Sequence, residues 1–140
     1  MVDPHSTDDI HIAELRPLVS PAIVMEELAL DEKGAALIEK TRKDIANICS
    51  GKDDRLLVVV GPCSIHDPKA ALDYAKRLKS AMEEHQSELL IVMRVYFEKP
   101  RTTIGWKGLI NDPNLDGSFN INLGLKVARG LLLEITDMGI

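Results

Sequence analysis

The stretch LLVVVGPCSIHDP, residues 56–68, begins with five apolar residues and then turns at a glycine and a proline. A continuous apolar run of this kind is typical of a strand that is buried on both faces of a parallel sheet. Asp67 and Pro68 then predict the start of a helix over 68–84, because a capping side chain followed by proline at the first turn favours helix initiation. The chain is thereby restricted to folds built from parallel strand–helix units.

The same order repeats further along the chain. ELLIVMRVYF, residues 88–97, predicts a second strand, and a long loop rich in glycine, proline and asparagine leads to a last helix over 122–138 with Gly139 as its C-cap. Parallel strand–helix units form either open doubly wound sheets or closed barrels, and both place functional residues at the carboxyl ends of strands. Chemistry is therefore expected at GPCS and at RVYFEKPRT.

The amino-terminal part of the chain follows a different pattern. Ser20 and Pro21 predict the start of a short helix, and apolar residues at three- and four-residue spacings predict a second helix over 31–50. Before both lies a polar arm in which IHI alternates weakly, like an edge strand. We therefore divide the sequence into a helical extension over 1–54 and the start of an α/β domain over 55–140. Two strands leave apolar faces uncovered, which indicates a fragment of a larger fold.

Charge and cysteine content exclude several classes of function. A formal net charge of -5 without a basic run argues against nucleic acid as a partner, whereas small anions can still be held by local cations. Two cysteines and the lack of a leader with a basic start and an apolar run argue against secretion, so the cytoplasm is the expected compartment. No apolar run approaches the length needed to cross a membrane.

Cys63 follows Gly61 and Pro62 at the point where the backbone leaves the first strand. A lone cysteine often packs as a small buried hydrophobe, and that interpretation stays open. Alternatively its thiolate faces a cavity, where it would suit a metal ion or act as a nucleophile. His66 could pair with this thiol, but its place before the predicted helix favours a structural role. Cys49 is expected to pack on its helix.

Arg94 lies within the otherwise apolar second strand, where a buried guanidinium needs an anionic partner. An internal salt bridge and a bound anion both meet that need. The loop that follows adds further cations and hydroxyls, namely Lys99, Arg101, Thr102 and Thr103. Such a group can hold a carboxylate or a phosphate, through arginine as a bidentate fork and through lysine as a point charge. Glu98 could instead tie the lysine or arginine structurally.

Together with GWKGLINDP, these two segments resemble, in order and separation, the microbial type I 3-deoxy-D-arabino-heptulosonate 7-phosphate (DAHP) synthases. The resemblance runs from about Asp8 to the end of the chain and covers only the first part of a family member. It implies a (β/α)₈ TIM barrel behind an amino-terminal extension, of which this chain would hold the first two βα units. It also implies a transferase that condenses phosphoenolpyruvate with erythrose 4-phosphate and releases phosphate, in the first step of the shikimate pathway.

The resemblance implies roles for residues at both strand ends. Cys63 would bind the divalent metal that the family requires, which is Mn²⁺, Fe²⁺, Co²⁺ or Zn²⁺, and Arg94 with Lys99 would bind the carboxylate region of phosphoenolpyruvate. Arg101 and Thr102 would hold erythrose 4-phosphate, chiefly at its phosphate end, and Pro100 between the two groups would also contact substrate. The metal would polarise the aldehyde of that sugar. The family's other metal ligands, a histidine, a glutamate and an aspartate, fall on later strands, so the chain alone is expected to be inactive.

The amino-terminal arm carries a regulatory expectation. Asp8 and Asp9 of TDDIHIAEL would contact an aromatic amino acid inhibitor, and the arm resembles that of phenylalanine-sensitive members. In the family this arm packs against a neighbouring subunit of a homo-oligomer. A solvated acidic pair is the alternative. For the whole chain, two other interpretations stay open: a noncatalytic truncated module that keeps the assembly or effector-binding extension, and a thiol enzyme that uses Cys63 and His66.

Overall fold

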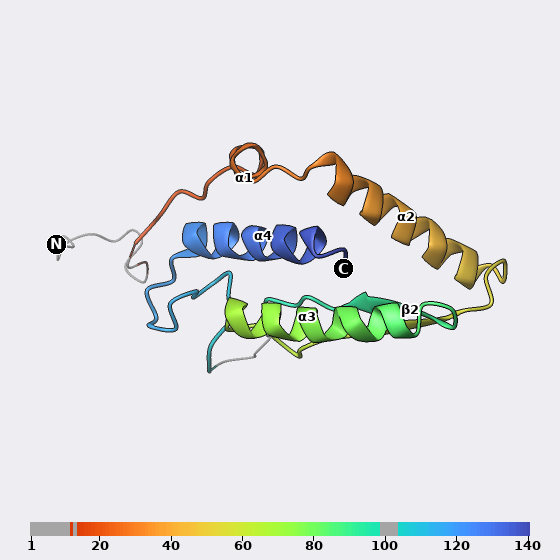
Figure 1. Ribbon diagram of the computed structural model, residues 1–140. Coiled ribbons are helices and arrows are strands. Elements are labelled where there is room, and N and C mark those ends of the chain that lie inside the picture. Colours follow the sequence, from red (N-terminus) through yellow and green to blue (C-terminus); the bar gives the residue numbers. More distant parts are fainter. Residues whose placement is uncertain (1–11, 13, 99–103) are drawn as a thin grey trace, which may run out of the picture.

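The computed structural model describes residue 12 and residues 14–98 and 104–140. Its elements are, in chain order, α1 (Pro21–Glu27), α2 (Glu32–Cys49), β1 (Leu56–Val60), α3 (Pro68–Glu84), β2 (Leu89–Met93) and α4 (Ile121–Asp137). β1 and β2 pair in parallel, with Leu56 opposite Leu89 and Val60 opposite Met93. In Figure 1, α4 lies between α1 and α2 on one side and α3 with the sheet on the other. The described chain is thus mixed α/β with a small parallel sheet.

The helix boundaries confirm the capping signals in the sequence. The Ser20 hydroxyl accepts the Ile23 amide at 3.3 Å before α1, and the Asp67 carboxylate accepts the Lys69 amide at 2.8 Å before α3. Gly139 follows the end of α4 with a φ of 84°, the left-handed conformation that favours glycine. None of the helices in the described part of the chain combines the length and hydropathy that a bilayer-spanning segment needs.

The second strand is shorter than the sequence predicts, because β2 ends at Met93 and not at residue 97. The ladder continues for one more bond, from the Arg94 amide to the Val60 carbonyl at 2.8 Å. It then meets Pro62, which has no amide hydrogen to donate. Beyond this point the segments that follow β1 and β2 are joined by one further hydrogen bond, from the Ile65 amide to the Tyr96 carbonyl at 2.8 Å. Regular pairing stops, although the two segments still run side by side.

The prediction that β1 is buried on both faces is wrong for this structure. Leu56 is 64% exposed and Val59 is 62% exposed, whereas Ile91 and Met93 of β2 are buried. Within the described residues β1 pairs only with β2, so one of its edges has no neighbouring strand. Its apolar composition is therefore that of an interior strand, while its surroundings are those of an edge strand.

The core lies where α3 and α4 pack on the sheet. Its buried members are Ile65, Ala71, Ala75, Met93, Leu109, Leu131 and Ile135. Gly124 allows α4 to approach the loop before it, because a Cβ at this position would overlap the main-chain oxygen of Ile110. This packing fixes the loop that precedes α4 against the end of β2.

A charged cluster connects the end of α2 with the start of β1. The Arg55 guanidinium donates to both carboxylate oxygens of Asp53, from Nε to Oδ1 at 3.1 Å and from Nη2 to Oδ2 at 2.7 Å, and lies 3.5 Å from the Asp44 carboxylate on α2. The hydrogen bonds from Arg55 lower the pKa of Asp53 below its ordinary value. The turn that would separate the extension from the α/β domain is therefore braced by ion pairs. The division at residue 54 itself stays a prediction.

Candidate functional site at the strand ends

The carboxyl ends of β1 and β2 lie at one edge of the sheet, because the two strands are parallel. Gly61 lets their continuations touch: a Cβ at this position would overlap the main-chain oxygen of Arg94. Real side chains never approach backbone so closely, so glycine is required by the contact and not by its backbone torsion angles. The segments that carry Cys63 and Arg94 are thereby held against each other.

Arg94 follows β2 directly and is exposed, so the expectation of a buried guanidinium inside the strand is wrong. Its Nη1 donates to the Pro62 carbonyl at 3.0 Å, and its guanidinium carbon lies 4.7 Å from the centre of the Tyr96 ring. Across residues 14–98 and 104–140, no carboxylate comes within ion-pair distance of it. The internal salt bridge is therefore not observed, and the remaining N–H groups can serve an anion.

Both cysteines are free and exposed, which contradicts the interpretation of Cys63 as a buried hydrophobe and the expected packing of Cys49. Cys63 points away from the core because it comes after the Gly61–Pro62 turn has left the sheet, while Cys49 is the last residue of α2, where the helix ends. An exposed thiol beside a strand end is free to bind a metal ion or to react.

His66 packs edge-on against Trp106, with ring centres 6.5 Å apart and planes at 89°. Among the described residues, no hydrogen bond joins it to Cys63. This contact supports the structural interpretation of His66. A thiol enzyme built on this pair therefore finds no support in the geometry.

The described residues do not assemble a metal centre by themselves. No group of three or more histidine, cysteine, aspartate or glutamate side chains that could hold a metal ion occurs within residues 14–98 and 104–140. Cys63 therefore stands as one potential ligand, which is too few for a structural or catalytic site. The other predicted site residues lie outside the described residues, namely Asp8, Asp9, Lys99, Pro100, Arg101, Thr102 and Thr103.

The loop that begins at Lys99 is anchored on both sides. Glu98 forms an antiparallel bridge with Gly108, and the Leu109 amide donates to the Phe97 carbonyl at 2.8 Å. Leu109 is 1% exposed, which fixes this end of the loop in the core. The Glu98 carboxylate accepts from the Asn111 side chain at 3.4 Å. The bridge holds the two flanks of the predicted substrate loop beside the strand ends.

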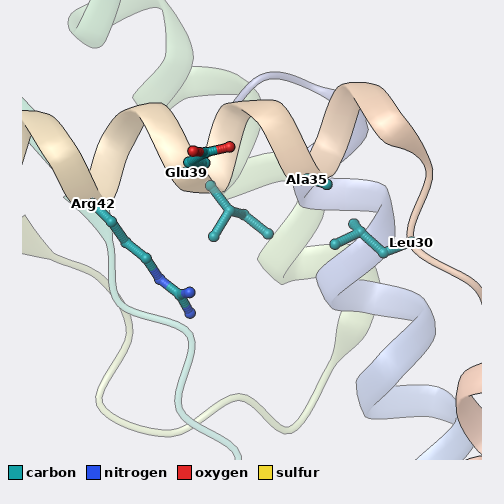
Figure 2. Close-up of a pocket in the computed structure, with 5 residues that line it drawn as sticks. Leu30, Ala35, Glu39 and Arg42 are labelled. Carbon is teal, nitrogen blue, oxygen red and sulfur yellow. The ribbon is translucent and has the colours of Figure 1, made fainter.

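Two hollows are lined by described residues other than Cys63 and Arg94. One of about 320 Å³ runs along α2 and is lined by Leu30, Ala35, Ile38, Glu39 and Arg42. Figure 2 shows the Arg42 side chain extending from the helix beside this hollow. The other, of about 310 Å³, is an apolar groove between α1 and α4. Neither of these two hollows is lined by Cys63 or Arg94.

Several known proteins are similar to this chain in sequence. The model of the DAHP synthetase I family matches residues 27–138. The Phe-sensitive phospho-2-dehydro-3-deoxyheptonate aldolase of Escherichia coli is 56% identical over 136 residues, which cover 97% of this chain and 39% of that protein. The Tyr-sensitive aldolase of the same organism is 52% identical, over 95% of this chain and 37% of that protein.

A solved structure agrees with the sequence matches. The phospho-2-dehydro-3-deoxyheptonate aldolase of Francisella tularensis superposes with a TM-score of 0.88 at 53% identity, over 92% of this chain and 38% of that one. The chain thus spans well under half the length of these relatives. With most of its residues matched by the family model and its fold shared with a family structure, the chain belongs to the DAHP synthetase I family.

Proposed function

We propose that the chain is the amino-terminal part of a DAHP synthase, which condenses phosphoenolpyruvate with erythrose 4-phosphate to give DAHP and phosphate. The observation that carries this proposal is the contact between the two strand ends, where Arg94 of the second segment binds the Pro62 carbonyl beside Cys63. Family membership supports the reaction class. We further propose that residues 55–140 are the first two βα units of a (β/α)₈ barrel and that residues 1–54 are an extension.

The roles of the cations follow from the charges of the two substrates. Both are anions, and they must approach each other for the new carbon–carbon bond to form, so fixed cations lower the electrostatic cost of that approach. In this proposal Arg94 and Lys99 bind the carboxylate region of phosphoenolpyruvate, and Arg101 and Thr102 bind erythrose 4-phosphate, chiefly at its phosphate. Pro100 is a further substrate-binding residue. The enol carbon of one substrate is then held against the aldehyde carbon of the other.

Arg94 is suited to this task because its guanidinium is positioned before any substrate arrives. The hydrogen bond to Pro62 uses one N–H group, and the Tyr96 ring covers one face of the guanidinium. Less side-chain entropy is therefore lost when an anion binds. The remaining donors form a planar fork, which matches a carboxylate in a way that an ammonium group does not.

A divalent metal is part of the proposal, with Cys63 as one ligand. The described residues supply only this thiolate, so they do not fit a complete metal site and no reaction step is derived through the metal. The remaining ligands would have to come from outside the described residues. The exposed position of Cys63 at the sheet edge is the feature that makes its participation possible.

The 140-residue chain alone is expected to form no DAHP and to bind no divalent metal with submicromolar affinity, because one thiolate does not make a metal site. Formation of DAHP is assayed with added Mn²⁺, and metal binding is measured by calorimetry. The comparison is a full-length chimaera, in which this chain replaces the matching segment of the Phe-sensitive Escherichia coli enzyme. We expect the chimaera to form DAHP from the two substrates.

Two outcomes contradict the proposal. An inactive chimaera beside an active Escherichia coli parent would show that this segment does not supply its share of a working site. Robust turnover or tight metal binding by the chain alone would show that it completes the site without the rest of the enzyme. Binding of phenylalanine by the chain without any turnover in the chimaera would favour the noncatalytic module instead.

Arg94→Lys in the chimaera is expected to raise the KM for phosphoenolpyruvate by about tenfold or more, because lysine keeps the charge but loses the fork. The KM for erythrose 4-phosphate should change much less. Steady-state kinetics with each substrate varied in turn gives both values. Lys126→Arg on α4 is the matched control, since it exchanges the same two residue types on a helix away from the sheet edge. Equal effects on both KM values would contradict the assignment of Arg94.

The amino-terminal arm is proposed as the effector-binding part of a homo-oligomer. Relatives named Phe-, Tyr- and Trp-sensitive support regulation by an aromatic amino acid, and we favour phenylalanine. Replacing both Asp8 and Asp9 by alanine in the chimaera should raise the phenylalanine concentration for half inhibition, because an ammonium group loses its anionic partners. Turnover without inhibitor should stay unchanged. Inhibition at the parent's phenylalanine concentration would contradict the role of these carboxylates.

A further inference from the structure

The loop before α4 carries the sequence DPNLDGS at residues 112–118, in which Asp112, Asn114 and Asp116 alternate with other residues and are followed by Gly117. This is the first half of the pattern found in EF-hand calcium loops. In those loops side-chain oxygens at positions 1, 3 and 5 and the carbonyl oxygen at position 7 bind the ion, and glycine at position 6 makes the sharp turn. A pattern this short indicates a calcium site only if the loop also has the geometry of an EF-hand loop.

The loop is closed around the Asp112 carboxylate. Its Oδ2 accepts the Gly117 amide at 3.1 Å, and Gly117 has a φ of 74°. The Asp116 carboxylate accepts the Ser118 amide at 2.9 Å, which turns the chain towards α4. The segment from Asp112 to Ser118 is therefore curled, with its first carboxylate bonded across the turn to the glycine.

Asp112 also presents an unexplained oxygen. It is 6% exposed, and its Oδ1 is buried with no hydrogen-bond partner. The other oxygen of the same carboxylate accepts the Gly117 amide, so the carboxylate group bridges the two ends of this segment. A buried carboxylate oxygen without a donor is costly, and a bound cation would remove that cost.

A second carboxylate lies close to the first. Hydrogen bonds from Ser118 lower the pKa of Asp116 below its ordinary value, and the side chain of Asp112 also acts on it. Asn114 between them is exposed and makes no hydrogen bond or ion pair to the described residues, so its amide oxygen is available.

We propose that residues 112–118 form a weak calcium site, in which side-chain oxygens of Asp112, Asn114 and Asp116 and the carbonyl oxygen of Ser118 bind the ion and water completes its shell. Calcium is favoured over magnesium because it accepts a flexible set of six to eight oxygens, whereas magnesium demands a near-octahedral shell. The proposed site has two carboxylates, one amide and one carbonyl as ligands. It therefore does not need a group of three histidine, cysteine, aspartate or glutamate side chains, and the described residues contain no such group. The proposal does not depend on the proposed enzyme function.

Two features keep the expected affinity low. An EF-hand loop places a bidentate glutamate at its twelfth position, where this chain has Leu123. The Arg16 guanidinium also approaches the Ser118 carbonyl, at 3.4 Å, and brings a positive charge to that side of the loop. With two charged ligands the expected Kd is on the order of 10⁻⁴ to 10⁻³ M.

Trp106 provides a specific probe, because it is the chain's one tryptophan and its indole N–H donates to the Asp112 carbonyl at 2.9 Å. Terbium, which resembles calcium in its oxygen ligands, should show emission when the indole is excited. The titration uses the whole 140-residue chain, and calcium should displace the terbium. Asp116→Asn should weaken binding about tenfold or more, since one of two charged ligands is lost. Asp54→Asn, an exposed carboxylate before β1, should change nothing.

A second measurement does not involve terbium or a variant. The Gly117 amide, which bonds Asp112, should shift in the nitrogen–proton NMR spectrum as calcium is added, while the Gly51 amide in the turn after α2 should not. Asp116 is exposed, so its variant should keep the parent's circular dichroism. Emission that is absent, or equal in parent and Asp116→Asn, overturns the proposal. So does a Gly117 amide that calcium at 10 mM, about ten times the weakest expected Kd, leaves unmoved.

Discussion

Cys63→Ala in the full-length chimaera is expected to remove both bound metal and metal-dependent turnover. The thiol is exposed at the sheet edge, beside the Pro62 carbonyl that holds Arg94, so its loss would open the metal shell next to the bound substrate. Changing residues that only support metal ligands costs about 10- to 100-fold in affinity or activity, so losing a ligand itself should cost at least that much. Metal content by elemental analysis and kcat should fall together.

Cys49→Ala is the matched control for this experiment. Cys49 is the chain's other free and exposed thiol, and it lies at the end of α2 and not at the end of a strand. Its removal should leave metal content and turnover at the parent's level. Stoichiometric metal and full activity in Cys63→Ala would contradict the ligand role. A loss of activity with metal retained would assign Cys63 to the substrate and not to the metal.

Gly61→Ala is expected to destabilise the chain by about 1–3 kcal/mol or more, because the added methyl group overlaps a main-chain oxygen that cannot rotate away. The continuation of β2 would have to move, and the bond from the Arg94 amide to the Val60 carbonyl would be strained or lost. Urea unfolding followed by circular dichroism measures the change in the free energy of unfolding. In the chimaera, the same displacement should lower turnover.

Gly130→Ala is the control for added methyl volume. Gly130 lies inside α4, and a Cβ there would meet nothing within 4 Å. Alanine should stabilise the helix by about 0.5–1 kcal/mol, because it loses less backbone entropy on folding than glycine. If Gly61→Ala unfolded at the same urea concentration as the parent, the close approach of the two strand ends would not be the reason for glycine at this position.

Local signals in the sequence predicted the helices well, because caps act over three or four residues. Ser20, Asp67 and Gly139 mark three helix boundaries, and each does so in the structure. β2 ends earlier than its own sequence predicts, because its ladder stops opposite Pro62, which follows the partner strand. The length of a strand depends on its partner strand, and the register between the two cannot be predicted from the sequence of one strand alone.

The surroundings of the site residues were harder to predict than their positions. The sequence predicts Cys63 at the end of the first strand and Arg94 buried within the second, whereas Arg94 follows the end of β2 and both residues are exposed. Burial depends on how many neighbouring strands are present, and β1 has one in this structure. The bond from Arg94 to Pro62 spans 32 residues and depends on strand register, so no local pattern reports it. The spacing of DPNLDGS, on which the proposed calcium site depends, is visible in the sequence, but it lies within a stretch whose composition by itself predicts only a loop.

The hydrogen bond that orients Arg94 is accepted by the main-chain oxygen of residue 62. It therefore does not depend on which side chain stands at that position. Any residue that keeps the turn would offer the same acceptor at 62, whereas position 61 admits only glycine. Mutational tolerance should therefore change abruptly between two neighbouring residues. Evolution could therefore replace Pro62 without changing the orientation of Arg94, because the acceptor of the hydrogen bond belongs to the backbone.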